Sequence, residues 1–422
     1  MSGFQRALSR AHPALFCLFA GLAGFSTYFA MYAFRKPFTA ASFEHVSGWA
    51  FLLDYKIALV LAQVAGYALS KLIGIKVIAE VSPSRRIGLI LGLVGTSWLA
   101  LVAFALIPAP WNVITLFFNG LPLGMIWGLV FGYMEGRRVS EVLGSILCAS
   151  FILASGAVKS VGSLLMDDYG IDRFWMPAAT GAVFLPLLLV GVLGLSLLPP
   201  PSEDDEAARV RRAPMGRAER QAFLALYAPG IAFLVAGYVL LTAFRDFRDN
   251  FAAEIWAGLG FDHPAALFTA SELPVAVIAL AALGAIILVK DNRRALMVIH
   301  GLVGLGFALI GIGTLAFQSG AISPLTWMIM TGAGVYVAYT PFNAMLFDRL
   351  VAYSGRIATA GFLIYIADAS GYVGSVALLL WKNFGVVDMN WVRFFTLSAY
   401  ATSLVGMASV AAAGIYFARR KA

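Results

Sequence analysis

Residues 14–36 read ALFCLFAGLAGFSTYFAMYAFRK, and no charged side chain occurs in this stretch before Arg35 and Lys36. A helix needs about 20 consecutive, mostly apolar residues to cross a bilayer. The apolar core of a signal peptide is shorter, about 7–15 residues, and a cleavage site of small residues follows it. No such site follows this stretch, so we predict that it is retained as a first membrane span.

The composition extends this interpretation to the whole chain of 422 residues, of which 61% are hydrophobic and 12% charged. Soluble domains carry about 25% charged residues. A soluble enzyme, a secreted domain and a disordered chain are therefore excluded, and a polytopic membrane protein is expected. Cys17 and Cys148 lie in apolar runs and provide neither a disulfide framework nor a metal spacing.

Apolar runs of spanning length occur twelve times and predict an all-α membrane protein. The predicted spans are 14–36, 49–73, 87–108, 112–134, 142–166, 174–198, 223–247, 265–289, 294–317, 324–347, 357–381 and 392–417. Residues 199–221 begin with three prolines and are rich in charge. We interpret them as a cytoplasmic linker between two six-helix bundles, residues 1–198 and 222–422. A solvated tether is expected there, with regulatory docking as the alternative.

Basic residues predict the orientation. The net charge is +8, and most Lys and Arg residues lie in the N-terminal segment and in the loops on its side of the predicted membrane. Cytoplasmic loops carry such an excess. We therefore expect both termini to be cytoplasmic, in the inner membrane of a bacterium. Because the basic residues serve the helix ends, we expect contact with membrane lipid and none with nucleic acid.

A short repeat relates the two halves. Residues 32–35 read YAFR and residues 242–245 read TAFR, and each is preceded at four residues by a tyrosine, Tyr28 or Tyr238. Two six-helix halves related by an axis along the membrane normal are the architecture of the major facilitator superfamily. With twelve spans and a central linker, the repeat predicts that fold in two pseudo-symmetric bundles.

The repeated arginines are the strongest site candidates. Tyr28, Tyr32 and Arg35 are spaced so that they share one helical face. An arginine at bilayer depth costs at least ~2.5–3.5 kcal/mol unless it faces water or a partner. The guanidinium is a planar donor suited to phosphate or carboxylate. We therefore expect Arg35 and Arg245 to bind one anion that Tyr28 and Tyr32 orient.

The alternative places both arginines at the outer membrane interface. Pro37 follows Arg35 closely, and Arg245 precedes a charged stretch containing Asp246 and Asp249. In that stretch Asp249 is also a candidate coupling carboxylate.

Two lysines and one aspartate lie inside predicted spans. Lys71, near the inner end of its span, is either a site residue or a snorkelling side chain. Lys159 lies deep in the fifth span and needs a cavity, a carboxylate or deprotonation. Asp368, deep in the eleventh span, is the obvious partner. Such a pair serves either as a gate or proton-linked switch or as a permanent structural contact. We expect Lys71 and Lys159 to keep the inner cavity positive.

Three further polar positions have two interpretations each. Glu272, near the outer end of the eighth span, is either a coupling carboxylate or an interfacial residue. Lys56 is expected at the interface. Asn343, just after Pro341, is able to hydrogen-bond a substrate or a neighbouring helix. Glycines at 120, 124, 128 and 132 are interpreted as a helix-packing stripe.

Motifs for catalysis and cofactors are missing from the sequence. The four histidines are scattered, and no His/Glu pair has metal-ligand spacing on a helix. No glycine-rich loop ends in Lys-Ser or Lys-Thr, so no nucleotide-driven pump is indicated. We expect no enzyme, no cofactor and no metal, and transport that is secondary.

Several motifs resemble a known family, the organophosphate:phosphate antiporters of the major facilitator superfamily. Residues 28–38, with Tyr28, Tyr32, Arg35 and Lys36, resemble its Tyr-x-x-x-Tyr-x-x-Arg-Lys-Asn-Phe signature. Further short matches, in order along the chain, are Ser70-Lys71, residues 119–125, Arg245 with Asp249, residues 339–341 and residues 371–375.

The resemblance implies a function. In that family two arginines bind phosphate, and they match Arg35 and Arg245, while Tyr28, Tyr32 and Lys71 match residues that line the site. The chain departs from the family at residues 148–150, which read CAS where glycerol phosphate members have a histidine, and at Pro37, which replaces an asparagine.

We therefore expect a secondary active transporter that moves a small, phosphorylated anion by alternating access in exchange for phosphate, and functions as a monomer. One alternative is a proton-coupled symporter of an organic anion or other small solute, with Asp368 or Glu272 as the proton carrier. Another is a non-transporting sensor on the same fold.

Overall fold

The computed structural model describes residues 3–82, 85–134, 137, 139–202, 205, 217–354 and 360–420. Regular secondary structure in these residues is helical throughout, and 11 helices among them are long and apolar enough to cross a membrane. A helix satisfies its own backbone hydrogen bonds, which lipid cannot do. The chain is therefore an integral membrane protein. Residues 203–204 and 206–216 of the predicted linker lie outside the described residues.

The backbone divides into two compact units. The first unit comprises Met1–Arg209 with Asn250–Ala270, and the second comprises Val210–Asp249 with Ser271–Ala422. Residues 250–270, which the sequence places between the seventh and eighth spans, thus pack with the first six spans.

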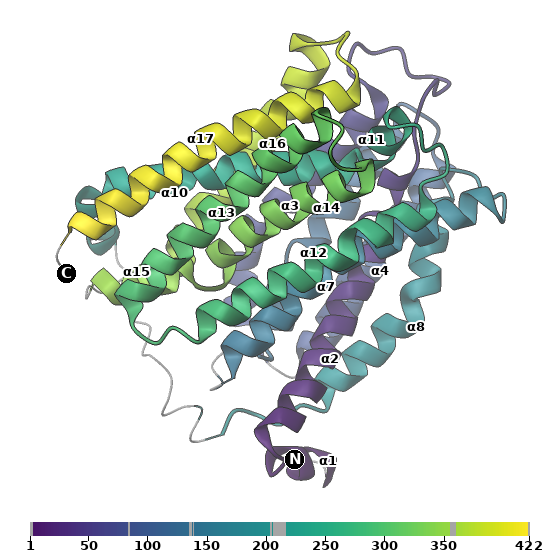
Figure 1. Cartoon of the computed structure of the whole chain (residues 1–422). Helices are drawn as coiled ribbons and strands as arrows, with labels where there is room; N and C mark the ends of the chain where they lie inside the picture. The colour runs from purple at the N-terminus through teal and green to yellow at the C-terminus, as the bar shows by residue number, and fades with distance from the viewer. Residues whose placement is uncertain are drawn as a thin grey trace. The chain divides into compact units, whose positions relative to one another are not determined.

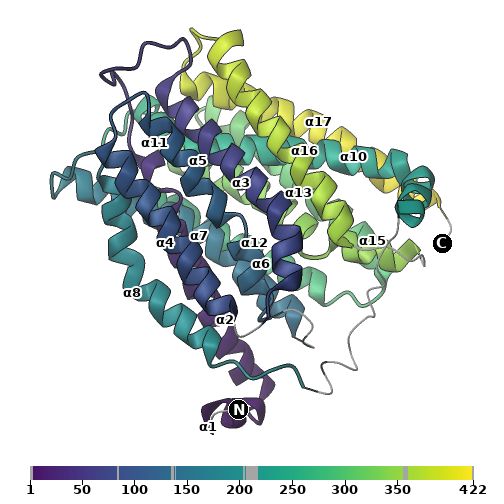
Figure 2. The same ribbon diagram turned by 180° about the vertical axis from the view of Figure 1, so that it is seen from behind.

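In the first unit, α2 packs against both α7 and α8, and α5 packs against α3 and α4 (Figure 1; Figure 2). Its elements are α1 (Gly3–Ser9), α2 (Pro13–Met31), the 3₁₀ turns η1 (Tyr32–Phe34) and η2 (Pro37–Ala40), α3 (Tyr55–Glu80), α4 (Arg86–Leu106), α5 (Asn112–Leu123), α6 (Ile126–Phe131), α7 (Ser140–Asp167), α8 (Met176–Ser196) and α11 (Ala252–Gly258).

In the second unit, α13 packs lengthwise against α14 and α17 (Figure 1). The elements that contribute to it are α10 (Arg217–Asn250), α12 (Ala265–Ile287), α13 (Asn292–Gln318), α14 (Pro324–Pro341), the π turn η4 (Phe342–Leu346), α15 (Phe347–Ser354), α16 (Ala360–Leu380), the π turn η5 (Trp381–Gly385) and α17 (Trp391–Arg419). The first six residues of α12 belong to the first unit.

Three predicted spans are less regular than a single α-helix. The first leaves the α conformation at Met31 and continues as η1, and the fourth is broken between α5 and α6 after Pro122. The tenth predicted span, 324–347, is not among the 11 spanning helices; within it α14 ends at Pro341 and a π turn follows. Proline supplies no backbone N–H and crowds the preceding turn, so regular helices weaken around it.

Glycines let two helices of the first unit cross in close contact. A Cβ on Gly120 of α5 would lie 2.2 Å from the carbonyl oxygen of Gln63, and one on Gly66 of α3 would lie 2.1 Å from that of Phe117. Gly124 likewise faces the backbone of α3 at Tyr67. The packing interpretation of the glycine stripe is confirmed at positions 120 and 124.

Residues 250–270 are anchored on the first unit by a buried ion pair. The Lys56 ammonium lies 2.6 and 2.8 Å from the two carboxylate oxygens of Glu254 and donates to the carbonyl of Thr39. Lys56 is 3% exposed, so the prediction that it lies at the interface is wrong. The carboxylate of α11 holds it inside the unit.

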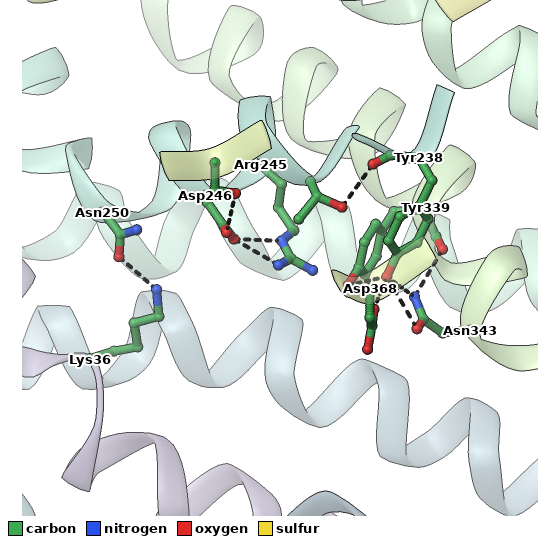
Figure 3. Close-up of polar contacts among 10 residues, drawn as sticks. Lys36, Tyr238, Arg245, Asp246, Asn250, Tyr339, Asn343 and Asp368 are labelled. Atoms are coloured by element: carbon green, nitrogen blue, oxygen red, sulfur yellow. Dashed lines mark hydrogen bonds and ion pairs between the residues drawn. The ribbon is translucent and has the colours of Figure 1, made fainter. Parts of the chain in front are cut away.

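Two further hydrogen bonds extend the anchor. Lys36 donates to Asn250 at 2.7 Å, a contact drawn in Figure 3, and the Ser160 hydroxyl lies 2.7 Å from that of Thr269. Burial raises the pKa of the Glu254 carboxyl, although Lys56 acts in the opposite direction. The loss of hydration thus raises the pKa of this carboxyl more than the attraction of Lys56 lowers it.

A first prediction concerns the α3–α5 crossing. We expect Gly120→Ala to destabilise the protein by about 1–3 kcal/mol, because the new methyl group would overlap the backbone of α3. Thermal unfolding in detergent measures the effect. Gly92→Ala on α4 is the control, since a Cβ there meets nothing within 4 Å; equal loss of stability in both variants would refute the packing role.

A second prediction concerns the Lys56–Glu254 pair. Lys56→Met alone leaves Glu254 buried without its cation, which we expect to cost about 3–5 kcal/mol. The double variant with Glu254→Met removes both desolvated charges and should recover most of that loss. Thermal unfolding of the two single variants and the double variant gives the coupling, and additive losses would contradict a direct pair.

Candidate functional site

Arg35 lies at the end of the irregular turn η1, with its guanidinium stacked on an aromatic ring. Its guanidinium carbon is 3.9 Å from the ring centroid of Tyr67 on α3 and 5.9 Å from that of Tyr32. Tyr28 meets Tyr32 edge-on at 5.7 Å. A ring face attracts a cation, and more strongly once water is removed. The structure therefore brings Tyr28, Tyr32 and Arg35 together within the first unit.

Tyr67 is the residue of this group that sequence reasoning missed. The ammonium of Lys71 lies 5.6 Å from the same ring, so Tyr67 contacts both cations of the group. We call Tyr28, Tyr32, Arg35, Tyr67 and Lys71 the Arg35 cluster. One signal was present in the sequence, because Tyr67 precedes Lys71 by four residues and shares its helical face.

Buried amides hold the backbone where α2 ends. Gln63 donates to the carbonyl of Arg35 at 2.8 Å and to Asn119 at 2.7 Å. Asn119 donates to the carbonyl of Phe34 at 2.8 Å. These carbonyls no longer have regular helical partners, and the amides satisfy them inside the unit. The position of Arg35 is thus determined by α3 and α5 as well as by its own helix.

Arg245 in the second unit has a similar environment. Its guanidinium carbon is 4.2 Å from the ring centroid of Tyr339 on α14. Its Nη2 lies 2.7 Å from the carboxylate of Asp246, which also accepts a hydrogen bond from Ser375 at 2.7 Å. The arginine is 19% exposed. Figure 3 shows Arg245 with Asp246, the acidic neighbour that the interfacial alternative proposed.

A polar cluster adjoins Arg245 through Tyr339. The buried hydroxyl of Tyr238 donates a short hydrogen bond to the carboxylate of Asp368 and lies 3.0 Å from the hydroxyl of Tyr339. Asn343, in the π turn η4, donates to the Tyr238 oxygen at 3.4 Å. Figure 3 shows these four residues together, and we call them the Asp368 cluster.

This cluster brings three predicted polar positions into the interior of one unit. Tyr238 and Tyr339 stack with ring centroids 5.1 Å apart. The irregular π turn carries Asn343 into the group, and such turns are frequent at functional sites.

The remaining predicted residues lie elsewhere. Lys159 on α7 is buried in the first unit, with its ammonium 5.7 Å from the ring of Phe268. Asp368 belongs to the second unit, and the predicted pairing of these two residues stays a prediction. Glu272 is buried and pairs with Arg248 at 2.6 Å, and Asp249 is the half-buried neighbour of that arginine.

Both units place a guanidinium against the ring of a tyrosine. Each unit presents one guanidinium supported by a tyrosine face, and the second unit adds hydroxyl, amide and carboxylate groups beside it. Among the described residues, no group of three or more His, Cys, Asp or Glu side chains is arranged to hold a metal ion.

Solved structures of transporters share this fold. The D-xylose-proton symporter has a TM-score of 0.64 and 16% identity, over 96% of this chain and 97% of the other. A peptide transporter POT in complex with sulfate has a TM-score of 0.61 and 16% identity, over 94% and 93%. A bacterial homologue of the human drug peptide transporters has a TM-score of 0.60 and 14% identity, over 96% and 98%. The chain has a fold of the major facilitator type.

Sequence comparison supplies the family. None of the curated protein sequences compared with the chain matches it significantly. A family model described as "Family of unknown function (DUF5690)" matches residues 37–420, and the chain therefore belongs to that family.

Proposed function

We propose that the protein is a secondary active transporter that moves a small anion across a membrane by alternating access. Arg35 and Arg245 are its anion-binding groups. The observation that carries the proposal is the environment that the two arginines share. Each guanidinium stacks on a tyrosine of a different helix in its own unit, at 3.9 and 4.2 Å.

The stacking leaves the guanidinium edge as the recognition surface, on Arg35 and on the part of Arg245 that does not donate to Asp246. Its N–H groups lie in the plane of the guanidinium, so a ring beneath it fixes the plane and leaves donors at the rim. Phosphate and carboxylate accept such pairs of donors. Tyr28 and Tyr32 orient the ion beside Arg35, and Lys71 adds positive charge near the same Tyr67 ring. Asn343 supplies polar contacts beside Arg245.

The proposed architecture has twelve spans in two pseudo-symmetric bundles. Eleven helices meet the criteria for a span, and α14 with η4 and α15 supplies the additional crossing at residues 324–347. The distribution of Lys and Arg supports cytoplasmic termini in a bacterial inner membrane.

We propose phosphate or a phosphate ester as the substrate, with exchange for phosphate as the transport mode. The resemblance of residues 28–38 to the organophosphate:phosphate antiporters supports this substrate. Asp246 already binds Arg245 in the structure. When the ion binds, it either displaces this carboxylate or binds Arg245 beside it.

A second candidate is proton-coupled symport of the anion. It is favoured by two carboxylates of the second unit, the buried Glu272 beside Arg248 and the half-buried Asp368 beside Tyr238. One of the proteins with a similar structure, the D-xylose-proton symporter, is also a proton symporter.

A third prediction tests the anion site. Purified protein in proteoliposomes loaded with phosphate should exchange it for labelled phosphate. We expect Arg35→Lys and Arg245→Lys each to lower the exchange rate about 10–100-fold, because a lysine keeps the charge but loses the paired donors and the stacking. Arg173→Lys is the control, since Arg173 contacts the carbonyls of Ser42 and Glu44 at the exposed surface.

Two results would contradict the proposal. One is the absence of phosphate and phosphate-ester exchange by folded wild-type protein. The other is unchanged exchange in both lysine variants. Competition by a panel of phosphate esters then identifies the organic part of the substrate.

A further inference from the structure

Glu272 and Arg248 form an ion pair in the interior of the second unit. The Nη1 atom of Arg248 on α10 lies 2.6 Å from Oε1 of Glu272 on α12. The two side chains are 4% and 8% exposed. The interfacial interpretation of Glu272 therefore does not describe its surroundings, because the residue is enclosed with a cation of its own.

The third helix at this pair is α14, which contributes backbone and no charge. Arg248 Nη2 donates to the carbonyl of Met328 at 2.9 Å. Gly332 makes room for the guanidinium, because a Cβ there would lie 2.6 Å from Nη2. Arg248 is the charged side chain in contact with Glu272 in the described structure, and the nearest other charges along α10 are those of Arg245, Asp246 and Asp249.

The pair is only half satisfied. Oε2 of Glu272 and Nε of Arg248 are buried and have no hydrogen-bond partner among the described residues. A buried pair contributes to stability when further hydrogen bonds satisfy its remaining atoms. An oxygen without a donor leaves the carboxylate costly in its charged form, and a proton removes that charge. Asp368 is different, since its carboxylate accepts the hydroxyl hydrogen of Tyr238.

Protonation of Glu272 would change the charge balance one helical turn from the anion site. Arg248 and Arg245 are three residues apart on α10, which places them as neighbours along the helix surface. The neutral carboxyl no longer compensates Arg248, so the region gains one positive charge. That charge favours an anion, and by linkage a bound anion favours the proton to the same extent.

We propose that Glu272 is a proton-binding site, with Arg248 as its switch partner, and that proton uptake there is coupled to anion binding at Arg245. The inference rests on the second candidate function, proton-coupled symport of the anion, and assigns the carboxylate that carries its proton. The proton comes from water on the side to which the site is open, adds to a carboxylate oxygen of Glu272 and weakens the bond to Arg248. It leaves to water on the opposite side after the anion is released.

Gradient-driven uptake into proteoliposomes tests the coupling, with labelled inorganic phosphate as the probe. Vesicles without internal phosphate receive a pH gradient, acidic outside. If one proton moves with each ion, wild type should accumulate phosphate about tenfold per unit of pH gradient. Exchange of internal for external phosphate moves no net proton and serves as the parallel assay.

Glu272→Gln mimics the protonated side chain and should keep the exchange while losing the gradient-driven accumulation. Glu254→Gln is the matched control, because it also removes a buried carboxylate from its cation, in the first unit. It should retain accumulation. Three outcomes would overturn the inference while leaving anion transport intact. Wild type exchanges phosphate but does not accumulate it, accumulation survives Glu272→Gln, or both variants lose accumulation.

Infrared spectroscopy tests the proton site without any transported ion. Acidification of the purified wild-type protein should produce a C=O band of a buried, protonated carboxyl group. Because the Glu254 carboxyl is buried as well, the band should lose one component in Glu272→Gln and a different component in Glu254→Gln. Its absence from wild type, or an unchanged band in Glu272→Gln, would overturn the assignment. Failure of phosphate transport alone would instead count against the proposed function.

Discussion

Cations enclosed among apolar helices need compensation for the water they lose, and this constraint organises both units. Arg35 and Arg245 are compensated by the faces of Tyr67 and Tyr339. Ring faces stabilise a guanidinium without occupying its in-plane donors. Arg245 has in addition the carboxylate of Asp246 at 2.7 Å. In the proposed transporter, the tyrosine faces support each half-buried guanidinium while its remaining in-plane donors stay available to an anion.

Irregular backbone occurs where these cations are placed. The first span leaves the α conformation just before Arg35, and a π turn follows α14 just beyond Tyr339. Each break exposes carbonyls that need new donors inside an apolar environment. In the first unit Gln63 and Asn119 supply them. The cost of the break is thus offset by side chains that also fix the direction in which Arg35 points.

Other cations are compensated by carboxylates, and these pairs were beyond prediction. Lys56 meets Glu254 and Arg248 meets Glu272 through contacts between helices that the sequence separates by 198 and 24 residues. Hydropathy gives the length of a span and the side of the membrane on which its flanking charges lie. It does not give the rotation of the helix about its own axis. Lys56 was therefore expected at the interface, although it is buried, and Tyr67 was overlooked because its partners lie on another element as well as its own.

The sequence by itself determined the class of the protein and most of its spanning segments. It showed as well that Arg35 and Arg245 occupy corresponding positions of a repeat. Length, hydropathy and repeats are local properties of the chain. It also predicted the shared face of Tyr28, Tyr32 and Arg35, since helical spacing alone sets it. Only the tertiary structure decided which ring or carboxylate compensates each cation and which oxygen of Glu272 lacks a donor. Those outcomes depend on how helices rotate and approach one another, and glycines such as Gly120 permit that approach without showing which side chains it brings together.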